Sequence, residues 1–343
     1  MNNDIDFVII WVDGSDPDWI KQKLKYSGAL VSKDKIDESA CRYRDWDNLK
    51  YLFRGIEKFT PWVRKVHFVT CGHVPEWLNL ECEKLNFVKH SDYIPKEYLP
   101  TFSSHSIELN LHRIKGLSEK FVYFNDDMFI IRPMKNTDFF KDGKPRMEAL
   151  LNRINANCYN DMMPHIGLND IGVINSNFTK KDFIKNNFFK LYNIRYGIMS
   201  VVRNMLLSVF SGISGFYWHH FPSAFIKGTF LELWKKEYNS LDSTCKNKFR
   251  SIADVNQYLF STWQIMKGNF TPTSIEKRNK VYFNISEEMN NIIGTIIKPT
   301  CDMICLNDND GCKDFDVSKK KIKDAFEKLL PDKSTFERGG LDE

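Results

Sequence analysis

The chain has 343 residues, of which 42% are apolar and 14% aromatic, so it is long enough to bury one large core or two smaller ones. This composition excludes an intrinsically disordered protein. The 49 Lys and Arg residues outnumber the 44 Asp and Glu residues, and the basic residues are scattered rather than gathered into arginine-rich blocks. We therefore expect a globular protein that does not bind nucleic acid. The mild positive charge taken alone points to no special partner, although it would also suit phosphate-bearing ligands or an anionic membrane.

The start of the chain carries no recognisable export signal. Acidic residues stand where a signal peptide has Lys or Arg, and the first apolar run stops at Asp13. The eight cysteines include no C-x-x-C pair, which favours reduced thiols and a cytoplasmic location. Cys301, Cys305 and Cys312 suggest a metal site, but their spacing fits no standard zinc pattern.

Short apolar runs alternate with helical patterns over the first half. Ile5–Val12 is a continuous apolar run, which is typical of a strand buried on both faces of a parallel sheet. Three further runs share this character: Val66–Thr70, Leu85–Val88 and Phe121–Phe124. Between them, Asp47–Phe59 and Ser104–Ile114 carry apolar residues at helical spacing. The alternation predicts an α/β fold with a Rossmann-like, mostly parallel sheet and crossover helices, and a ligand site beyond the carboxyl ends of the strands.

The second half is predicted to be mainly helical. The expected helices are Lys180–Tyr192, Ile198–Phe210, Thr229–Tyr238, Ile252–Met266 and Val317–Leu329. Residues 1–160 are therefore interpreted as an α/β part, and residues 161–343 as a mainly helical part packed with it as one unit. Ile198–Phe210 has a single charge and is too short to span a bilayer of about 30 Å. We interpret it as a buried helix, with a segment that dips into one membrane face as the alternative.

An acidic turn with a glycine, WVDGSDP, follows the first strand at residues 11–17. Pro17 and the Ser and Asp before it are ordinary signals for the start of a helix. The functional alternative is that backbone N–H groups of this turn receive a nucleotide, with Asp13 on its base or ribose and Gly14 allowing close approach. Trp11 and Asp16 are included as candidate substrate-binding residues.

A second candidate segment is RYRD, residues 42–45. Arg42 and Arg44 alternate on an extended stretch, so their guanidinium groups project to one side, where they would suit a diphosphate. A surface cluster of salt bridges that includes Asp45 explains the pattern equally well.

A third segment is the predicted helix that Ser104 begins. His105, Glu108 and His112 are spaced i, i+3 and i+7, which places them on one helical face that could ligate a metal or position a base. The alternative is a surface pair of Glu108 with His112 or Arg113.

The fourth segment is the end of the Phe121–Phe124 strand, where Asn125, Asp126 and Asp127 precede another apolar run, Met128–Ile131. Two carboxylates between buried strands are costly unless a positive charge meets them, so a divalent cation is the most economical explanation. Mg²⁺ binds in proteins through a few carboxylates together with waters and substrate phosphates. Because side chains alternate along a strand, we expect one Asp to face the metal and the other to brace the loop.

Taken together, these segments resemble the Stealth family, which includes bacterial capsule and exopolysaccharide phosphotransferases and the catalytic subunit of the animal lysosomal-enzyme N-acetylglucosamine-1-phosphotransferase. The first conserved region is matched by IDFVIIWVDGSDPDW, and the second by RYRDWDNLKYLFRGIEKFTPWVRKVHFVTCGHVPEWLN with LPTFSSHSIELNLHRIKGLSEKFVYFNDDMFI. The third is similar to HHFPSAFIKGTFLELW and the fourth to KFRSIADVNQYLF, and the ending ICLNDND…LLPDKSTFE also resembles bacterial members. The resemblance covers nearly the whole chain.

The resemblance implies four catalytic residues: Glu108, Asp127, His220 and Arg250. His219 is an extra neighbour, which leaves the assignment between the two histidines open. His105 stands where other members carry different residues, which weakens the helix face with three ligands. Further candidate substrate-binding residues are Asn125, His112 and Arg113. The resemblance also implies that residues 1–160 bind a nucleotide-sugar and that residues 161–343 contribute His220 and Arg250.

The family implies transfer of hexose-1-phosphate, often N-acetylhexosamine-1-phosphate, from a UDP-sugar to a saccharide hydroxyl, with release of UMP and formation of a phosphodiester. Mg²⁺ or Mn²⁺ is expected on Asp127, with Asp126 as the second ligand. Arg250, helped by Arg42 or Arg44, is expected on the phosphates. His220 is favoured as the base over Glu108. A lipid-linked acceptor would place the enzyme at the inner face of the membrane.

Three other functions remain open from the sequence. A metal-dependent glycosyltransferase would use the same donor but release UDP. A metal phosphohydrolase built on His105, Glu108 and His112 would release phosphate or sugar phosphate without an acceptor. A module of a capsule complex without enzymatic activity would use Ile198–Phe210 to dock.

Overall fold

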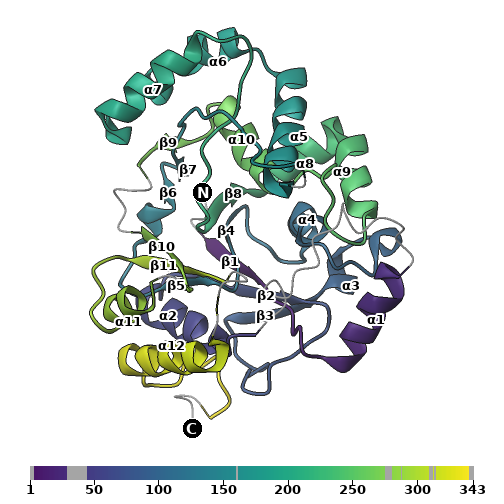
Figure 1. Ribbon diagram of the computed structural model, residues 1–343, viewed down its shortest axis with the longest axis vertical. Coiled ribbons are helices and arrows are strands. Elements are labelled where there is room, and N and C mark those ends of the chain that lie inside the picture. Colours follow the sequence, from purple (N-terminus) through teal and green to yellow (C-terminus); the bar gives the residue numbers. More distant parts are fainter. Residues whose placement is uncertain are drawn as a thin grey trace.

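A five-stranded sheet forms the centre of the computed structural model, which describes residues 4–28, 45–159, 161–274, 280–286, 288–308, 312 and 314–339 (Figure 1). Its strands are β1 (Ile5–Ile10), β2 (Val66–Thr70), β3 (Leu85–Lys89), β4 (Lys120–Phe124) and β8 (Ser223–Ile226), in the order β3-β2-β1-β4-β8. The first four strands are parallel, and β8 pairs antiparallel with β4. The four predicted strands and the mostly parallel sheet are confirmed, although β1 ends at Ile10 rather than at Val12.

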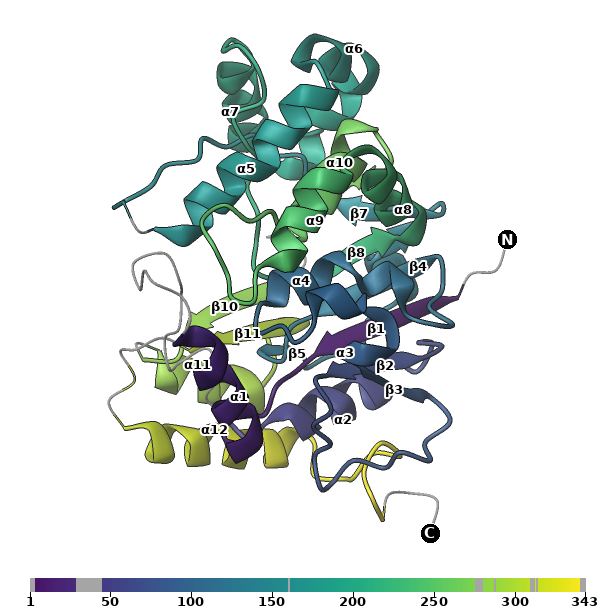
Figure 2. The same ribbon diagram turned by 90° about the vertical axis from the view of Figure 1, so that its right-hand side faces the viewer.

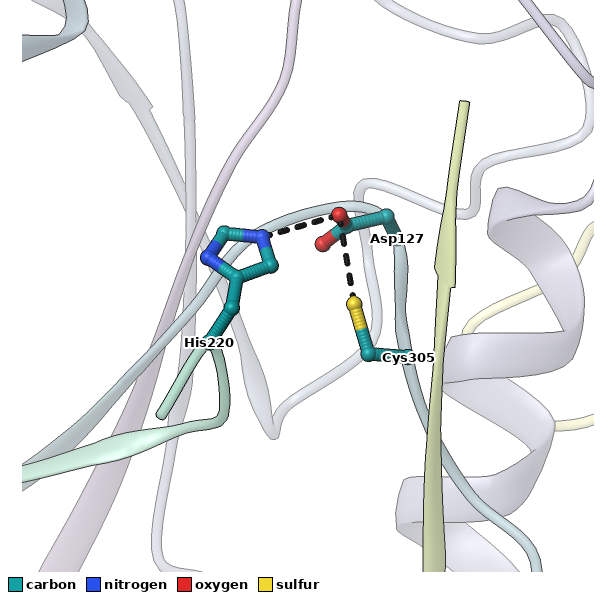
Figure 3. Close-up of side chains that lie close together, drawn as sticks. All are labelled: Asp127, His220 and Cys305. Atoms are coloured by element: carbon teal, nitrogen blue, oxygen red, sulfur yellow. Dashed lines mark hydrogen bonds and ion pairs between the residues drawn. The ribbon is translucent and has the colours of Figure 1, made fainter. Parts of the chain in front are cut away.

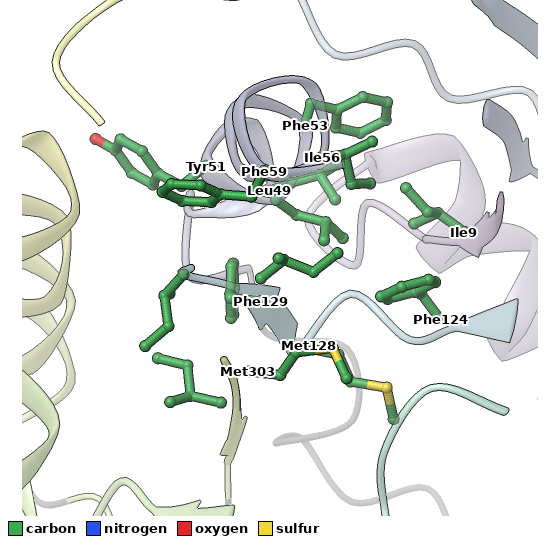
Figure 4. Packing of buried hydrophobic residues seen from close by; sticks show 14 of the residues in the cluster. Ile9, Leu49, Tyr51, Phe53, Ile56, Phe59, Phe124, Met128, Phe129 and Met303 are labelled. Atoms are coloured by element: carbon green, nitrogen blue, oxygen red, sulfur yellow. The ribbon is translucent and has the colours of Figure 1, made fainter. Parts of the chain in front are cut away.

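The two faces of this sheet are covered by different helices because side chains alternate along each strand. Phe7 and Ile9 pack in one apolar cluster and Val8 in the other. The first cluster lies under α2 (Leu49–Phe59) and α12 (Phe315–Leu329), as Figure 4 shows for α2. The second cluster lies under α4 (Ser104–Leu109), α8 (Lys227–Lys236) and α10 (Tyr258–Met266).

A smaller sheet contains β5, the strand that follows β4 in the chain. It consists of β10 (Lys280–Asn284), β11 (Met303–Asn307) and β5 (Met128–Ile130), with β11 pairing antiparallel with β5. Helix α2 crosses β5 so closely that a Cβ atom on Gly55 would collide with the carbonyl oxygen of Ile130. Glycine therefore permits the contact between α2 and the strand that follows Asp127.

The remaining strands and helices lie around these two sheets. A third sheet contains β6 (Phe140–Lys141), β7 (Lys144–Met147) and β9 (Thr271–Pro272). The other helices are α1 (Pro17–Ser27), α3 (His90–Tyr93), α5 (Met162–Asn177), α6 (Lys180–Leu191), α7 (Ile198–Ser208), α9 (Tyr238–Lys246) and α11 (Met289–Ile297). Short 3₁₀ turns cover Lys96–Tyr98, Leu111–Arg113, Asn136–Asp138 and Ile194–Tyr196. Figure 2 shows α6 and α7 at the end of the molecule opposite to α12.

The predicted helices differ from the structure in three respects. The predicted helix Ser104–Ile114 ends at Leu109 and continues as a 3₁₀ turn, and only the part from Tyr258 onward of the predicted helix Ile252–Met266 is helical. Helices α5, α9 and α11 were not predicted. The interpretation of Ile198–Phe210 as a buried helix is wrong, because Asn204 is the single buried residue of α7.

Residues 161–343 share their sheets with residues 1–160. Strand β8 completes the central sheet beside β4, and β11 pairs with β5. These two pairings bring the second half of the chain to the two ends of the Asn125–Asp127 segment. None of the helices in the described ranges combines the length and the apolar character that crossing a bilayer requires.

Candidate active site

A cavity of about 970 Å³ opens at the carboxyl ends of β1 and β4. Trp11 and Val12 line it just after β1, and Asn125, Asp126 and Asp127 line it just after β4. The chain runs from β1 to β2 and β3 on one side of the sheet and then to β4 on the other. The cavity therefore lies at the point where the strand order reverses, where ligands bind in open α/β sheets.

Asp127, which lines this cavity, makes two side-chain contacts (Figure 3). Its Oδ2 atom lies 3.0 Å from Nε2 of His220 and accepts a hydrogen bond from Sγ of Cys305 at 3.4 Å. The sheet pairings explain this convergence: Tyr123 lies opposite Ser223 in β4 and β8, and Met128 lies opposite Cys305 in β5 and β11. Three distant segments therefore meet at one carboxylate.

Of the adjacent His219 and His220, His220 is the one that lines the cavity. Burial lowers its pKa, but the charge of Asp127 and the hydrogen bond with it raise the pKa by more, so the net shift is upward. The neighbouring His219 does not line the cavity, and its Nε2 lies 3.1 Å from Oε2 of the buried Glu148. The sequence alone left open which of the two histidines has the catalytic role, and the structure shows that they have different surroundings.

Asp126 also lines the cavity, but with its side chain exposed to the cavity space. The protein around that space desolvates the carboxyl group, and Asp127 adds a like charge next to it. Together these effects raise the pKa of Asp126 to about 7. The two adjacent acids differ in their contacts, since only Asp127 reaches His220 and Cys305.

A short network connects Glu108 with His220. The hydroxyl of Tyr123 lies 3.1 Å from Oε1 of Glu108 and 2.5 Å from Oδ1 of Asn125. Nδ2 of Asn125 lies 3.4 Å from Nε2 of His220. Burial and the Glu108 carboxylate raise the pKa of Tyr123 well above its ordinary value, so its hydroxyl stays protonated and can donate.

Arg250 lines the cavity opposite the strand ends and donates to Oγ of Ser104 at 2.7 Å. The turn after it is fixed by Asp254, which is completely buried and accepts from the backbone N–H of Ser251 at 2.9 Å. The same carboxylate lies 2.8 Å from Nδ1 of His105. His105 therefore ties α4 to the turn that carries Arg250.

The structure does not bring His105, Glu108 and His112 together. Helix α4 ends at Leu109, and His112 packs beside the rings of Phe230 and Trp234, outside the cavity lining. Burial lowers the pKa of His112 to about 3.

The Arg113 guanidinium, which also lies outside the lining, stacks over the Trp234 ring at 4.8 Å. The predicted helix face with three ligands is absent because the α-helix stops one turn too early.

In the turn after β1, only some of the predicted substrate-binding residues line the cavity. Trp11 lines the cavity, whereas Asp13, Gly14 and Asp16 do not. Oδ1 of Asp16 accepts from the backbone N–H of Trp19 at 2.7 Å and so caps α1. Oδ1 of Asp13 accepts from the backbone N–H of Ser15 at 2.9 Å. The observed contacts are therefore those of a capped helix start.

Asp45 lines the cavity, and burial raises its pKa. Arg42 and Arg44 lie outside the described residues. Of the candidate segment 42–45, only Asp45 can be placed, and the predicted pair of guanidinium groups remains a prediction.

Sequence reasoning missed the contribution of β10 and β11. Tyr282, Asn307 and Asp308 line the cavity, and Oδ2 of Asp308 accepts from Nε1 of Trp46 at 2.9 Å. One feature of the sequence could have pointed to them: the segment ICLNDND resembles bacterial Stealth members. The resemblance assigned no role to these residues.

The potential metal ligands are Asp127, His220 and Cys305, whose ligand atoms lie within 4.8 Å of one another. In the described part of the chain, Oδ1 of Asp127 is buried and has no hydrogen-bond partner, which fits a carboxylate oxygen directed at a cation. No group of Cys301, Cys305 and Cys312 appears among the described residues. Burial and Asp127 raise the pKa of the Cys305 thiol well above its ordinary value, so it is protonated in this arrangement.

Three models of conserved Stealth regions match the chain. Conserved region 1 matches residues 3–31, conserved region 2 matches residues 42–147, and conserved region 4 matches residues 296–343. The predicted assignment of KFRSIADVNQYLF to the fourth region is wrong, because that region lies at the end of the chain and includes β11. Two of these regions meet at Asp127 and Cys305.

Curated relatives match over nearly the full length. The capsular polysaccharide phosphotransferase WcwK of Streptococcus pneumoniae is 42% identical over 335 residues, which cover 97% of this chain and 98% of the relative. The receptor polysaccharide phosphotransferase WefC of Streptococcus gordonii is 37% identical over 334 residues, covering 97% and 98%. The exopolysaccharide phosphotransferase cps2G of Lactiplantibacillus plantarum is 36% identical over 342 residues, covering 98% and 96%.

Among solved structures, the apo-form glycosyltransferase GlyE of Streptococcus pneumoniae TIGR4 aligns with a TM-score of 0.21 and 10% identity, over 86% of this chain and 72% of that chain. This likeness is too low to bear on the fold or the site. The family models and the full-length relatives agree with each other: the chain belongs to the Stealth family of phosphotransferase enzymes.

Proposed function

We propose that the enzyme transfers hexose-1-phosphate, with N-acetylhexosamine-1-phosphate as the expected group, from a UDP-sugar to a saccharide hydroxyl. The products are a phosphodiester, within a capsular or exopolysaccharide, and UMP. The names of the relatives support transfer of a phosphate-bearing group in polysaccharide synthesis. The choice of donor and the release of UMP belong to the proposal.

The observation that carries the proposal is the Asp127–His220 pair at the strand-order reversal of the sheet. The strand order β3-β2-β1-β4 matches the first four positions of the Rossmann order 3-2-1-4-5-6, and the crevice between strands 1 and 4 is where such sheets bind nucleotides. A carboxylate, an imidazole and the Arg250 guanidinium in one cavity provide the groups that phosphoryl transfer uses.

In the proposed reaction, the acceptor oxygen forms a bond to the phosphorus that bears the sugar, and the bond from that phosphorus to the bridging oxygen of UMP breaks. The acceptor proton moves to Nδ1 of His220, the ring nitrogen on the side away from Asp127 in Figure 3. Asp127 orients the ring and stabilises its protonated form. UMP is a weak enough base to leave as the anion.

Arg250 would bind the phosphates, and its hydrogen bond with Ser104 fixes its direction. Glu108 would orient the sugar through the network with Tyr123 and Asn125. It is also the second candidate for the base, because it lines the same cavity.

Asp127, with Asp126 beside it, would hold Mg²⁺ or Mn²⁺, which would neutralise the negative charge of the diphosphate. The free Oδ1 of Asp127 supports this assignment.

The proposed acceptor is a saccharide attached to a lipid carrier. The enzyme would then act in the cytoplasm, at the inner face of the membrane. The mildly positive net charge of +5 supports such a location, since that face is anionic.

The test is to incubate the enzyme with a panel of UDP-sugars, Mn²⁺ and a saccharide acceptor, and to identify the nucleotide product. We expect UMP, together with a phosphodiester signal in the phosphorus NMR spectrum of the product. UDP without a phosphodiester would instead establish a glycosyltransferase. Free sugar phosphate formed without acceptor would establish a hydrolase, and His220→Ala with full turnover would remove His220 from the mechanism.

A further inference from the structure

Helix α7 exposes its apolar face to solvent. Six apolar residues, here called the α7 stripe, are exposed: Ile198, Met199, Val202, Met205, Leu206 and Val209, with Met199 and Val209 each at 80%. At 3.6 residues per turn, these positions fall within one third of the helix circumference. Asn204 projects from the other side and is completely buried. The helix is therefore oriented with Asn204 inward and the stripe outward.

Hydrogen bonds of Asn204 fix this orientation. Its Oδ1 accepts from the backbone N–H of Leu151 at 2.7 Å, and its Nδ2 donates to the carbonyl oxygens of Ala149 and Leu191 at 2.9 and 2.7 Å. Rotating the helix to bury the stripe would leave these backbone groups without partners. The exposure of the stripe is thus enforced by the fold, and a contiguous exposed apolar surface of this kind indicates a binding surface.

The segment that carries the stripe contains basic but no acidic residues. From Phe183 to Trp218 the sequence contains no Asp or Glu, but it contains Lys185, Lys190, Arg195 and Arg203. A second cavity, of about 400 Å³, is lined by Met199, Val202 and Leu206 of the stripe together with Arg153 and Arg203. Apolar side chains and guanidinium groups therefore meet in one hollow, which suits a molecule that has an apolar chain and an anionic head.

We propose that the α7 stripe, with the arginines beside it, binds the surface of an anionic phospholipid membrane. Eleven residues are too few to span a bilayer, so α7 would lie in the interface with its stripe among the acyl chains. The arginines would contact the headgroup phosphates. A second copy of the chain is a poorer occupant, because a twofold contact would bring the same cations together without an acid from this segment to pair with them.

The stripe is connected to the catalytic cavity by a short segment of chain. Arg153 lines the second cavity, while Ile154 lines the large cavity together with Phe216. A membrane bound at the stripe would thus lie next to one wall of the active site. If the acceptor is lipid-linked, as in the proposed function, it would enter the active site from this side. Membrane binding by the stripe does not depend on the proposed function.

The test is cosedimentation of the purified full-length protein with phosphatidylcholine vesicles that contain or lack phosphatidylglycerol. We expect binding that requires phosphatidylglycerol and weakens with salt. The double variant V202E/L206E should bind roughly tenfold or more weakly, because two carboxylates would have to enter the apolar layer. Arg153→Gln and Arg203→Gln, which change the two arginines that line the second cavity, should each weaken binding about fivefold.

The matched control is L231E/V317E, which places two carboxylates on exposed apolar positions of α8 and α12. It should bind vesicles like the wild type. Unchanged thermal unfolding of V202E/L206E, and unchanged turnover with a water-soluble acceptor, would show that the stripe variant is folded.

Equal binding of the wild type and V202E/L206E would overturn the proposal, as would equal binding to vesicles with and without phosphatidylglycerol. A concentration-dependent dimer that V202E/L206E dissociates, without vesicle binding by the wild type, would assign the stripe to a second copy instead. Vesicle binding is measured without turnover, so release of UDP rather than UMP would refute the proposed function and leave this test unaffected.

Discussion

Asp127 and His220 are 93 residues apart in the sequence, yet Oδ2 of one lies 3.0 Å from Nε2 of the other. The cause is the antiparallel pairing of β8 with β4, which sets Ser223 opposite Tyr123. The residues that follow β4 and those that precede β8 must then meet at the same edge of the sheet. Strand β8, which is antiparallel to β4, therefore completes the candidate active site.

Replacing His220 by Gln is expected to lower kcat by about 10²–10⁴-fold, because the amide cannot accept the acceptor proton. His219→Gln is the matched control and should keep kcat close to wild type, since His219 faces Glu148 outside the cavity. The measurement is UMP release at saturating donor, with donor affinity measured separately by calorimetry. A larger loss for His219→Gln than for His220→Gln would reverse the assignment of the two histidines.

Removal of divalent cations with EDTA is expected to abolish transfer, and Mn²⁺ or Mg²⁺ should restore it. Asp127→Asn should raise the Mn²⁺ concentration needed for half-maximal activity more than Asp126→Asn does, because Asp127 carries the buried oxygen without a partner. The measurement is a metal titration of initial rates for the wild type and both variants. Full activity in EDTA would show that transfer does not need a metal. A larger effect of Asp126→Asn would show that Asp126, rather than Asp127, is the main metal ligand.

Local pattern in the sequence was sufficient to predict the four parallel strands of the central sheet, but it did not predict the antiparallel strand β8. Val66–Thr70 was predicted to the residue, because a strand buried on both faces leaves an uninterrupted apolar run. The family resemblance, rather than local pattern, assigned Glu108, Asp127, His220 and Arg250 to one site, and all four line the cavity.

The contribution of Cys305 could not be predicted, because it depends on a pairing between β5 and β11 that spans more than 170 residues. The orientation of α7 also could not be predicted from its apolar content, since the hydrogen bonds of Asn204 reach three separate backbone positions. In both cases contacts distant in sequence decide which way a side chain faces.

Cys305 is expected to act as a positioning residue for Asp127, to which its thiol donates a hydrogen bond at 3.4 Å. Cys305→Ala removes the donor and should lower kcat about tenfold, as expected for the loss of a hydrogen bond to a charged group. Cys305→Ser keeps a donor of similar size and should retain most of the activity. Initial rates and the Mn²⁺ requirement of both variants provide the measurement. Equal activity of the Ala and Ser variants would show that the hydrogen bond does not matter.

The pairing of Arg54 with Glu337 predicts how stability depends on pH. Arg54 donates from Nε and Nη2 to the two carboxylate oxygens of Glu337, both at 2.8 Å, and the side chains are only 6% and 4% exposed. Burial raises the pKa of Glu337, but the hydrogen bonds from Arg54 and Ser334 outweigh burial and lower the pKa below its ordinary value of 4.5. The pair anchors the end of the chain to α2, which packs on β5 beside Asp127.

A carboxyl group with a lowered pKa in the folded state stabilises the protein above its unfolded pKa, and this contribution disappears as the pH falls through the folded pKa. Glu337→Gln should therefore lower the free energy of unfolding by about 3 kcal/mol at neutral pH, the lower end for a broken buried ion pair, because Arg54 keeps only Glu327, which is 40% exposed, as a counter-charge at 3.1 Å. The difference from wild type should be constant above the ordinary pKa and shrink below it. Urea unfolding across this pH range measures it, with the exposed Glu81→Gln as the control. A difference that does not change with pH would mean that the loss comes from packing rather than from the charge of Glu337.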